Sequence, residues 1–126
     1  MNEFLIGGVR DDSAVQVAVA AGYPSHKIIN QSNWHALVNM LIKERIDLWA
    51  VGEMGGLWFL KHNNYRTKDF KKSYVLKEGL LYYAFSKDVD DKVVNQLQQA
   101  IDKVKIVNPK TGKSQYDEIV EKYISN

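Results

Sequence analysis

Cysteine is absent from this 126-residue chain, and no apolar run reaches the roughly 18 residues that suggest a membrane-spanning helix. The lack of cysteine excludes disulfides, thiolate nucleophiles and thiolate-bound metals, although it does not identify a cellular compartment. The start, Met1 to Phe4, lacks the basic region and the long apolar stretch of an export signal. The histidines are scattered without the spacing of metal ligands, so we expect no metal site.

The chain also lacks a strong excess of either charge. Its 17 basic and 15 acidic residues are spread along the sequence and give a net charge of +2, which does not favour nucleic-acid binding. A basic stretch from Lys61 to Lys72 includes Tyr65 and Phe70, but Asp69 interrupts it and no binding motif accompanies it. We interpret this stretch as a solvated loop and expect no nucleic-acid partner.

The first 62 residues alternate between short apolar runs and helical patterns, within a composition of 45% hydrophobic and 25% charged residues that is typical of a globular domain. We expect strands at 4–9, 26–30 and 46–51, and helices at 14–21, 34–42 and 53–62. Strands joined by helices form a parallel sheet through right-handed crossovers. The sequence therefore predicts an α/β fold with a parallel βαβαβ core, whose ligand crevice lies at the carboxyl ends of the strands.

The alternation ends after residue 64. Ser73 to Lys77 and Leu80 to Ser86 are two extended candidates that only Glu78 and Gly79 separate, which is too short for a crossover helix. An amphipathic helix near 93–104 and a short helix near 116–123 follow. We therefore divide the chain into an α/β core, residues 1–76, and a C-terminal tail, residues 77–126.

Polar residues follow two of the predicted strands and are the candidate ligand-binding residues. Asp11, Asp12 and Ser13 stand where the first strand leads into a helix, so they either cap that helix or face a ligand, and the two roles are compatible. Glu53 begins the third helix, either as an acid that the helix dipole favours or as a crevice carboxylate. Trp58 is a further candidate, whereas we expect Trp34 and Trp49 in the core.

Catalysis is not favoured by this set of residues. Carboxylates without a supporting histidine, nucleophile or phosphate-binding loop are weak evidence for acid-base chemistry or for a hard metal site. We therefore expect no enzyme and no cofactor.

Four stretches carry a resemblance to a known family. Ile6–Ala14 is similar to the pattern I-G-V-x-x-G-[ST]-T-A, and Ile46–Glu53, preceded by Arg45, resembles R-[VI]-D-A-x-x-x-D. Leu81–Asp88 looks like a return strand, and Tyr116–Tyr123 matches Y-x-x-I-x-x-K-Y. In order and spacing the chain resembles the second lobe and C-terminal tail of bacterial extracellular solute-binding proteins of family 3.

The resemblance implies a periplasmic-binding-protein-like (type II) lobe in a small-solute-binding component of an ABC-type uptake system. In that family two lobes close over a solute, often an amino acid, and deliver it to a membrane transporter from the periplasm. Here the first lobe, on which the tail helices pack, is missing. The chain then looks truncated, with half of a binding site.

The resemblance also assigns roles to single residues. Ser13 matches the second hydroxyl of the turn, Asp12 the first hydroxyl, Asp11 the glycine, and Glu53 the acid that often holds a ligand ammonium. Asp11 and Asp12 place negative charge where a ligand carboxylate would dock, and like charges at that range repel. The expected solute is therefore an amine-bearing or neutral molecule more than an ordinary α-amino acid.

Two alternatives from other classes remain open at this stage. A response-regulator receiver has this length, acids at the positions of Asp11 and Asp12, and a lysine after a late strand, here Lys87. Against it, Glu53 is not an acceptor aspartate, and the connection at Glu78 and Gly79 leaves no room for a receiver helix. The ligand-sensing lobe of a transcription regulator shares the fold, but its DNA-binding helix pair is absent from this sequence.

The tail also predicts self-association. Val93, Leu97, Ile101 and Val104 form an apolar stripe that must be covered, either by folding back on its own lobe or by a second copy of the chain. We expect a homodimer, formed by tail-to-tail packing or by a domain swap with its hinge at Lys77–Gly79.

Overall fold

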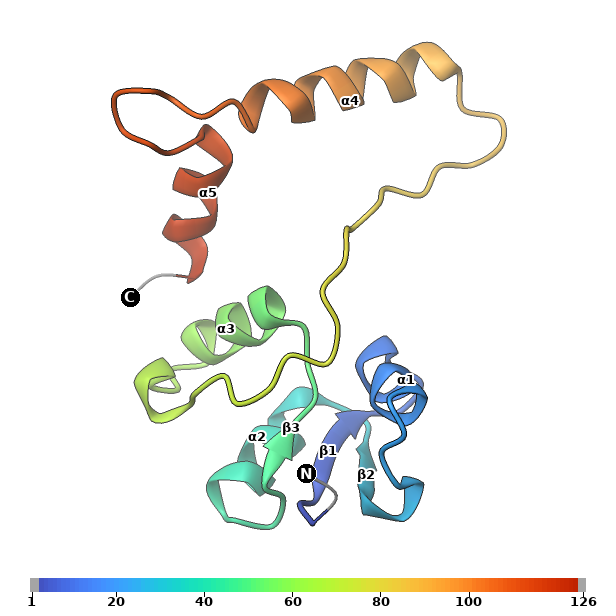
Figure 1. The fold of residues 1–126 in the computed structure, drawn as a ribbon, viewed down its shortest axis with the longest axis vertical. Coiled ribbons are helices and arrows are strands. Elements are labelled where there is room, and N and C mark those ends of the chain that lie inside the picture. The colour runs from blue at the N-terminus through green and yellow to red at the C-terminus, as the bar shows by residue number, and fades with distance from the viewer. Residues whose placement is uncertain (1–2, 125–126) are drawn as a thin grey trace. The chain divides into compact units, whose positions relative to one another are not determined.

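The computed structural model describes residues 3–124, which divide between Glu78 and Gly79 into two units (Figure 1). The elements of the first unit are β1 (Ile6–Val9), α1 (Ser13–Ala20), β2 (Ile28–Gln31), α2 (Trp34–Ile42), β3 (Leu48–Trp49) and α3 (Glu53–His62). Two short 3-10 helices, Ser25–Lys27 and Thr67–Asp69, complete it. The predicted alternation of strands and helices is thereby confirmed.

The three strands form a parallel sheet in the order β2-β1-β3, which confirms an α/β fold with a parallel βαβαβ core. Ile6 in the central strand is level with Ile28 on one side and with Leu48 on the other. Because the chain moves from β1 to β2 and then back across β1 to β3, right-handed crossovers place α1 and α2 on opposite faces. The sheet is thus covered on both sides by its own connections.

All three strands are shorter than the sequence indicates, and β1 begins only at Ile6. His26 and Lys27 belong to a 3-10 helix, so β2 begins only at Ile28. In β3 only Leu48 and Trp49 form the ladder, because the flanking residues have other roles: Ile46 is buried and Asp47 accepts a hydrogen bond from Leu5 N at 2.7 Å. The apolar run at 46–51 therefore indicates burial of these residues and does not give the length of the paired strand.

The face of the sheet that α1 covers holds the first core cluster. Ile6, Ala18, Tyr23 and Ile28 are its buried members, and the Tyr23 hydroxyl donates a hydrogen bond to Phe4 O at 2.5 Å. This bond connects the turn after α1 to the chain segment before β1. It also gives the buried hydroxyl of Tyr23 a hydrogen-bond partner while the ring fills the core.

The opposite face holds the second core cluster, built where α2 meets α3. Val38, Phe59 and Leu60 are buried, and Trp34 and Trp49 pack against them. The ring of Phe59 meets Trp34 and Trp49 edge-on, with centroids 5.3 and 6.2 Å apart, a geometry that aromatic rings favour. The core assignment of Trp34 and Trp49 is confirmed.

Residues 70–76, here called the strap, connect the two clusters. Phe70 packs against the second cluster and Leu76 against the first, so the strap passes from one face of the sheet to the other (Figure 1). The strand predicted at Ser73–Lys77 is wrong: these residues contain no strand, and most of them are exposed. The backbone of these residues is extended, as their sequence favours. No strand among the described residues forms backbone hydrogen bonds with it, so it does not become part of a sheet.

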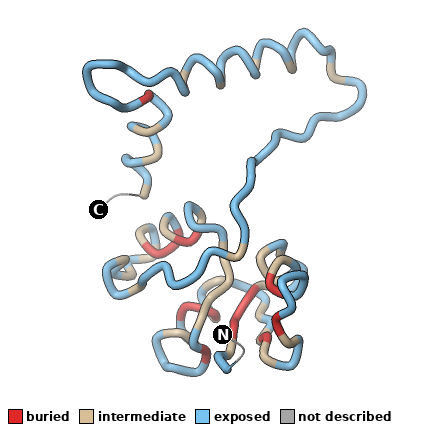
Figure 2. Tube along the Cα trace, viewed as in Figure 1, coloured by how far each residue is buried: buried red, intermediate tan, exposed pale blue. Residues whose placement is uncertain are grey.

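The second unit contains two helices after an extended segment: α4 (Asp91–Val104) and α5 (Gln115–Ile124). The return strand predicted at Leu80–Ser86 is also wrong, because the segment pairs with no strand among residues 3–124. Leu81 is 96% exposed and Tyr82 is 84% exposed. Ser114 is the only buried residue among residues 79–124, whereas the first unit has buried residues in its strands and helices, drawn red in Figure 2.

A turn at Asn108–Gly112 brings the chain from α4 into α5. The bridge between Val107 and Ser114 closes this turn, and Gly112 has a φ of 68°, which favours glycine. An ion pair of 2.7 Å between Lys113 and Glu121 then fixes the start of α5 to its own later turn.

Candidate functional site

The carboxyl ends of β1 and β3 form the candidate site. The connection that leaves β1 leads to β2 on one side, while β3 lies on the other side of β1. Such a reversal of strand order is the point at which open parallel sheets bind ligands. The residues that leave these two strands are Asp11, Asp12 and Ser13 after β1, and Glu53 after β3.

Asp12 is the N-cap of α1. Its Oδ1 accepts a hydrogen bond from Ala14 N at 3.0 Å and another from Ser13 Oγ at 3.2 Å. The predicted capping role is therefore confirmed, and the cap fixes both side chains in the loop at the carboxyl end of β1.

Asp11 adopts a left-handed backbone conformation with a φ of 63°. This conformation favours glycine, and aspartate is one of the few other residues that tolerate it well. The carbonyl oxygen of Asp11 accepts a hydrogen bond from Gln16 Nε2 at 3.4 Å. The position that resembles a family glycine thus has the backbone geometry that a glycine would supply.

A shallow surface depression lies beside α1. It is lined by Arg10, Asp11, Val15, Gln16, Val19, Ala20 and Asn30. Of the predicted site residues only Asp11 borders it. The depression therefore lies next to the carboxyl ends of β1 and β2, and no residue of β3 or α3 lines it.

Glu53 is the first residue of α3 and forms an ion pair with Lys72. Lys72 Nζ lies 3.2 Å from Oε1 and 3.3 Å from Oε2, and about 60% of each side chain is exposed. Sequence reasoning missed Lys72, which it placed in a solvated basic stretch. No periodic pattern in the strap could have shown that Lys72 returns to the start of α3.

Trp58 lies apart from the other candidates. Its ring stacks on His62 at a centroid distance of 4.3 Å, and the residue is 43% exposed. Because each helical residue turns the chain by about 100°, Trp58 stands roughly 140° around α3 from Glu53. The structure thus groups Asp11, Asp12, Ser13 and Glu53 at one end of the sheet and leaves Trp58 out of the group.

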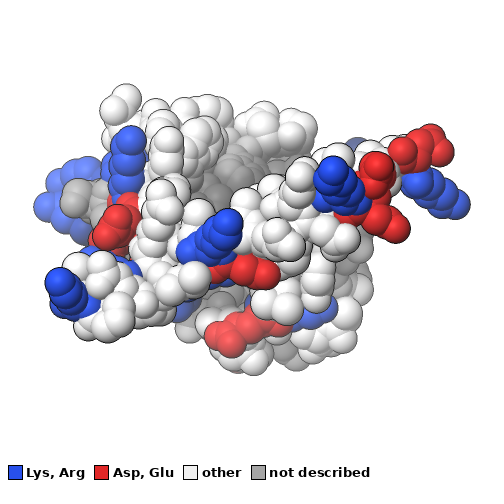
Figure 3. Space-filling model, turned by 90° about the horizontal axis from the view of Figure 1, so that it is seen from above, with Lys and Arg blue, Asp and Glu red and all other residues white. Residues whose placement is uncertain are grey.

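Neither the charge distribution on the face drawn in Figure 3 nor the metal-ligating side chains of residues 3–124 mark a second site. In the view of Figure 3 basic and acidic side chains lie interspersed, without a large area of one sign. Across residues 3–124 no three His, Asp or Glu side chains come together as metal ligands. None of the helices in that range is long and apolar enough to cross a membrane.

No protein-family model, curated protein or solved structure matches this chain.

Proposed function

We propose that this chain is a small-solute-binding lobe, with the type II periplasmic-binding-protein fold, of an ABC-type uptake system. The solute is an amine-bearing or neutral molecule, the delivery partner is a membrane transporter, and the location is periplasmic. The function is binding without catalysis. Lobe type, transporter and location rest on the resemblance of the sequence motifs.

One observation carries the proposal: Asp12 and Glu53 leave two adjacent parallel strands, β1 and β3, at the reversal of strand order. Each acid also stands at a helix start, where backbone N–H groups point outward. A carboxylate at the end of β3 provides a charged acceptor for a ligand ammonium, and such charge-assisted hydrogen bonds are short and strong. The alternation of strands and helices over residues 6–62 also supports the proposal, whereas the return strand that the motifs imply at Leu81–Asp88 is not formed.

A titration tests the proposal directly. Amino acids, primary amines and neutral polyols are added to the chain, and binding is followed by calorimetry and by amide chemical shifts. We expect an amine-bearing solute to bind, with shifts at Asp12, Ser13 and Glu53, and Glu53→Gln to weaken binding about tenfold, the value of one charge-assisted hydrogen bond.

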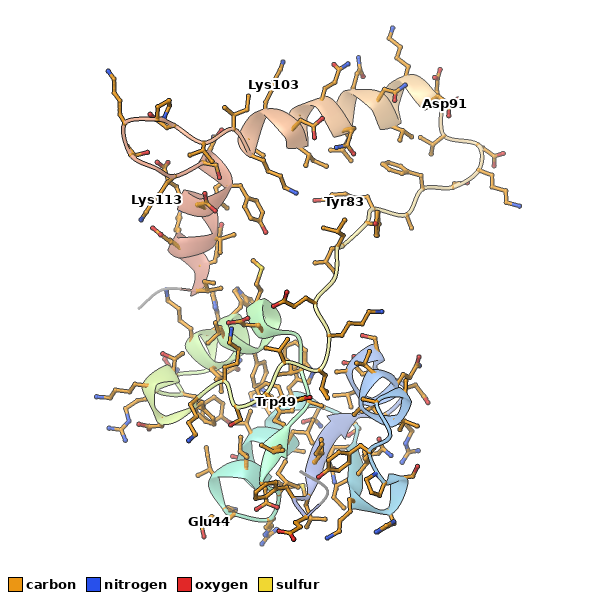
Figure 4. All side chains as sticks on the ribbon, viewed as in Figure 1. Glu44, Trp49, Tyr83, Asp91, Lys103 and Lys113 are labelled. Atoms are coloured by element: carbon orange, nitrogen blue, oxygen red, sulfur yellow. The ribbon has the colours of Figure 1, made fainter. Side chains whose placement is uncertain are left out.

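Glu44→Gln is the matched control. Glu44 lies in the turn that leads into β3, at the amino end of the sheet, well away from Trp49 in Figure 4. The substitution Glu44→Gln removes the same charge from the amino ends of the strands, opposite the candidate site. Equal affinities for every solute in Glu53→Gln and Glu44→Gln would show that the site is assigned wrongly.

A further inference from the structure

The strap crosses the sheet at the edge where the candidate site lies. Phe70 anchors one end in the second cluster and Leu76 anchors the other end in the first. Between these anchors Lys72 reaches Glu53, the first residue of α3 beyond β3. The strap therefore passes the carboxyl ends of the strands with its position fixed on both faces (Figure 1).

The contact between Lys72 and Glu53 reproduces the interaction expected of a bound amine. A primary ammonium stands 3.2 and 3.3 Å from the two oxygens of one carboxylate, so both lone-pair-bearing atoms are engaged. With 59% and 60% of the two side chains exposed, the contact is open to solvent, and an exposed pair of this kind is weak enough to be displaced.

We propose that Lys72 is an internal competitor that sets the selectivity of the site at Glu53. The inference rests on the proposed function, because it concerns the ammonium that Glu53 would otherwise bind. The strap tethers the Lys72 ammonium beside the carboxylate, and short tethers give effective concentrations in the millimolar range. A simple monoamine must outcompete that ammonium, whereas a solute with further contacts to the loop after β1 displaces it more readily.

The competition predicts how one substitution changes affinity. Ethylammonium is the probe, with ethanol as its neutral counterpart, and binding to the full chain is measured from NMR shifts. Lys72→Met should bind ethylammonium about two- to fivefold more tightly than the natural chain, the range of an exposed ion pair. Lys72→Arg should restore competition, and the response to ethanol should not change.

Lys71→Met is the matched control for charge. Lys71 is the exposed neighbour of Lys72 and makes no ion pair with any residue of the described range. The substitution Lys71→Met removes the same positive charge from the same segment as Lys72→Met. An equal gain in Lys71→Met and Lys72→Met would mean that overall charge governs affinity, and would overturn the proposal.

Backbone ¹⁵N order parameters of residues 70–76 give a readout that needs no solute. If the pair holds the strap, Lys72→Met and Glu53→Gln should each lower the order parameters there, and the double variant should lower them no further. Additive effects would show that the two residues do not interact and would overturn the inference while the proposed function stands. Coupled changes in the order parameters with no amine binding in any variant would instead remove the proposed function and the selectivity role together.

Discussion

Gly7 in the central strand is a position where a single methyl group has no room. A Cβ there would lie 2.7 Å from Leu37 Cδ2 and nearer still to Ile46 Cδ1. Both side chains are fully buried, so neither can move into solvent. The glycine lets α2 approach the sheet closely, which is one recognised use of glycine inside a strand.

We therefore expect Gly7→Ala to lower the free energy of unfolding of the first unit by about 1 to 3 kcal/mol, the usual cost of overpacking a core. Urea unfolding followed by circular dichroism measures the change. Gly79→Ala is the control, because a Cβ at Gly79 meets no atom within 4 Å. Equal midpoints for the two variants would refute the close approach at Gly7.

At the scale of the element, α5 has the best-defined start of any helix in the second unit. Ser114 N and Ser114 Oγ both donate to Asp117 Oδ2, at 2.8 and 2.7 Å, and Ser114 Oγ accepts from Asp117 N at 3.1 Å. This reciprocal arrangement is a capping box. The hydrogen bonds from Ser114 hold the pKa of the Asp117 carboxyl below its ordinary value of 3.8.

A lowered pKa makes the start of α5 sensitive to acid. The folded-state pKa lies below the unfolded one, so the stabilisation is fully present above pH 3.8 and is lost as the pH falls through the lower value. We expect the ¹³C secondary shifts of residues 115–124 to decline over that acidic range. Asp117→Asn keeps an acceptor without a titrating proton and should remove the transition.

Asp91→Asn, on α4, serves as the comparison and should leave the acid transition of α5 in place. On the alkaline side of the pH dependence the relevant group is Lys113, because its hydrogen bond to Glu121 raises its pKa above 10.5. The part of the stability that comes from the Lys113 ammonium is present below pH 10.5 and is lost as the pH rises through the raised pKa. An α5 transition that survives in Asp117→Asn would show that the capping box does not cause it.

The helices were predictable from the sequence because their caps and periods are local. Asn33 and Asp12 begin α2 and α1 through side-chain hydrogen bonds to nearby backbone, and Glu53 begins α3 at the predicted residue. The strands predicted at Ser73–Lys77 and Leu80–Ser86 failed because a strand depends on a partner elsewhere in the chain. Apolar extended residues indicate the capacity to pair and cannot identify the partner.

The site shows the same limit. The sequence placed Asp12 and Glu53 at strand ends, since strand ends follow from the alternation of elements. It missed Lys72, because the Glu53–Lys72 contact depends on where the strap crosses the sheet. Trp58 was a candidate because an aromatic side chain in the crevice could stack on a ligand, whereas the direction of its side chain around α3 decides its contacts.

At the scale of the whole molecule, the second unit exposes several large apolar side chains. Leu80, Leu81 and Tyr83 are 78%, 96% and 70% exposed, and the side chain of Tyr83 projects from the extended chain in Figure 4. Val93 on the stripe of α4 is 50% exposed. Exposed apolar patches of this kind mark surfaces that bind other chains.

We expect the chain to form a homodimer through this surface, with exchange of the segment that follows the hinge at Lys77–Gly79 as one route. Light scattering over a range of concentrations should give twice the chain mass of 14.5 kDa. Leu81→Glu should shift the equilibrium to monomers, whereas Asn95→Glu, an exposed polar position on α4, should not. A monomer mass at every concentration, with the tail resistant to protease, would indicate that the tail folds back instead.

The path of the strap has a consequence for the order in which the first unit is completed during synthesis. Each hydrophobic cluster receives a side chain from this late segment: Phe70 joins the second, and Leu76 joins the first, which otherwise begins at Ile6. Leu76 is far from Ile6 in the sequence, and the entropy of closing the intervening chain opposes so distant a contact. We therefore expect a nascent chain that ends before Phe70 to leave both clusters incompletely covered, and the first unit to be completed only once the strap has left the ribosome.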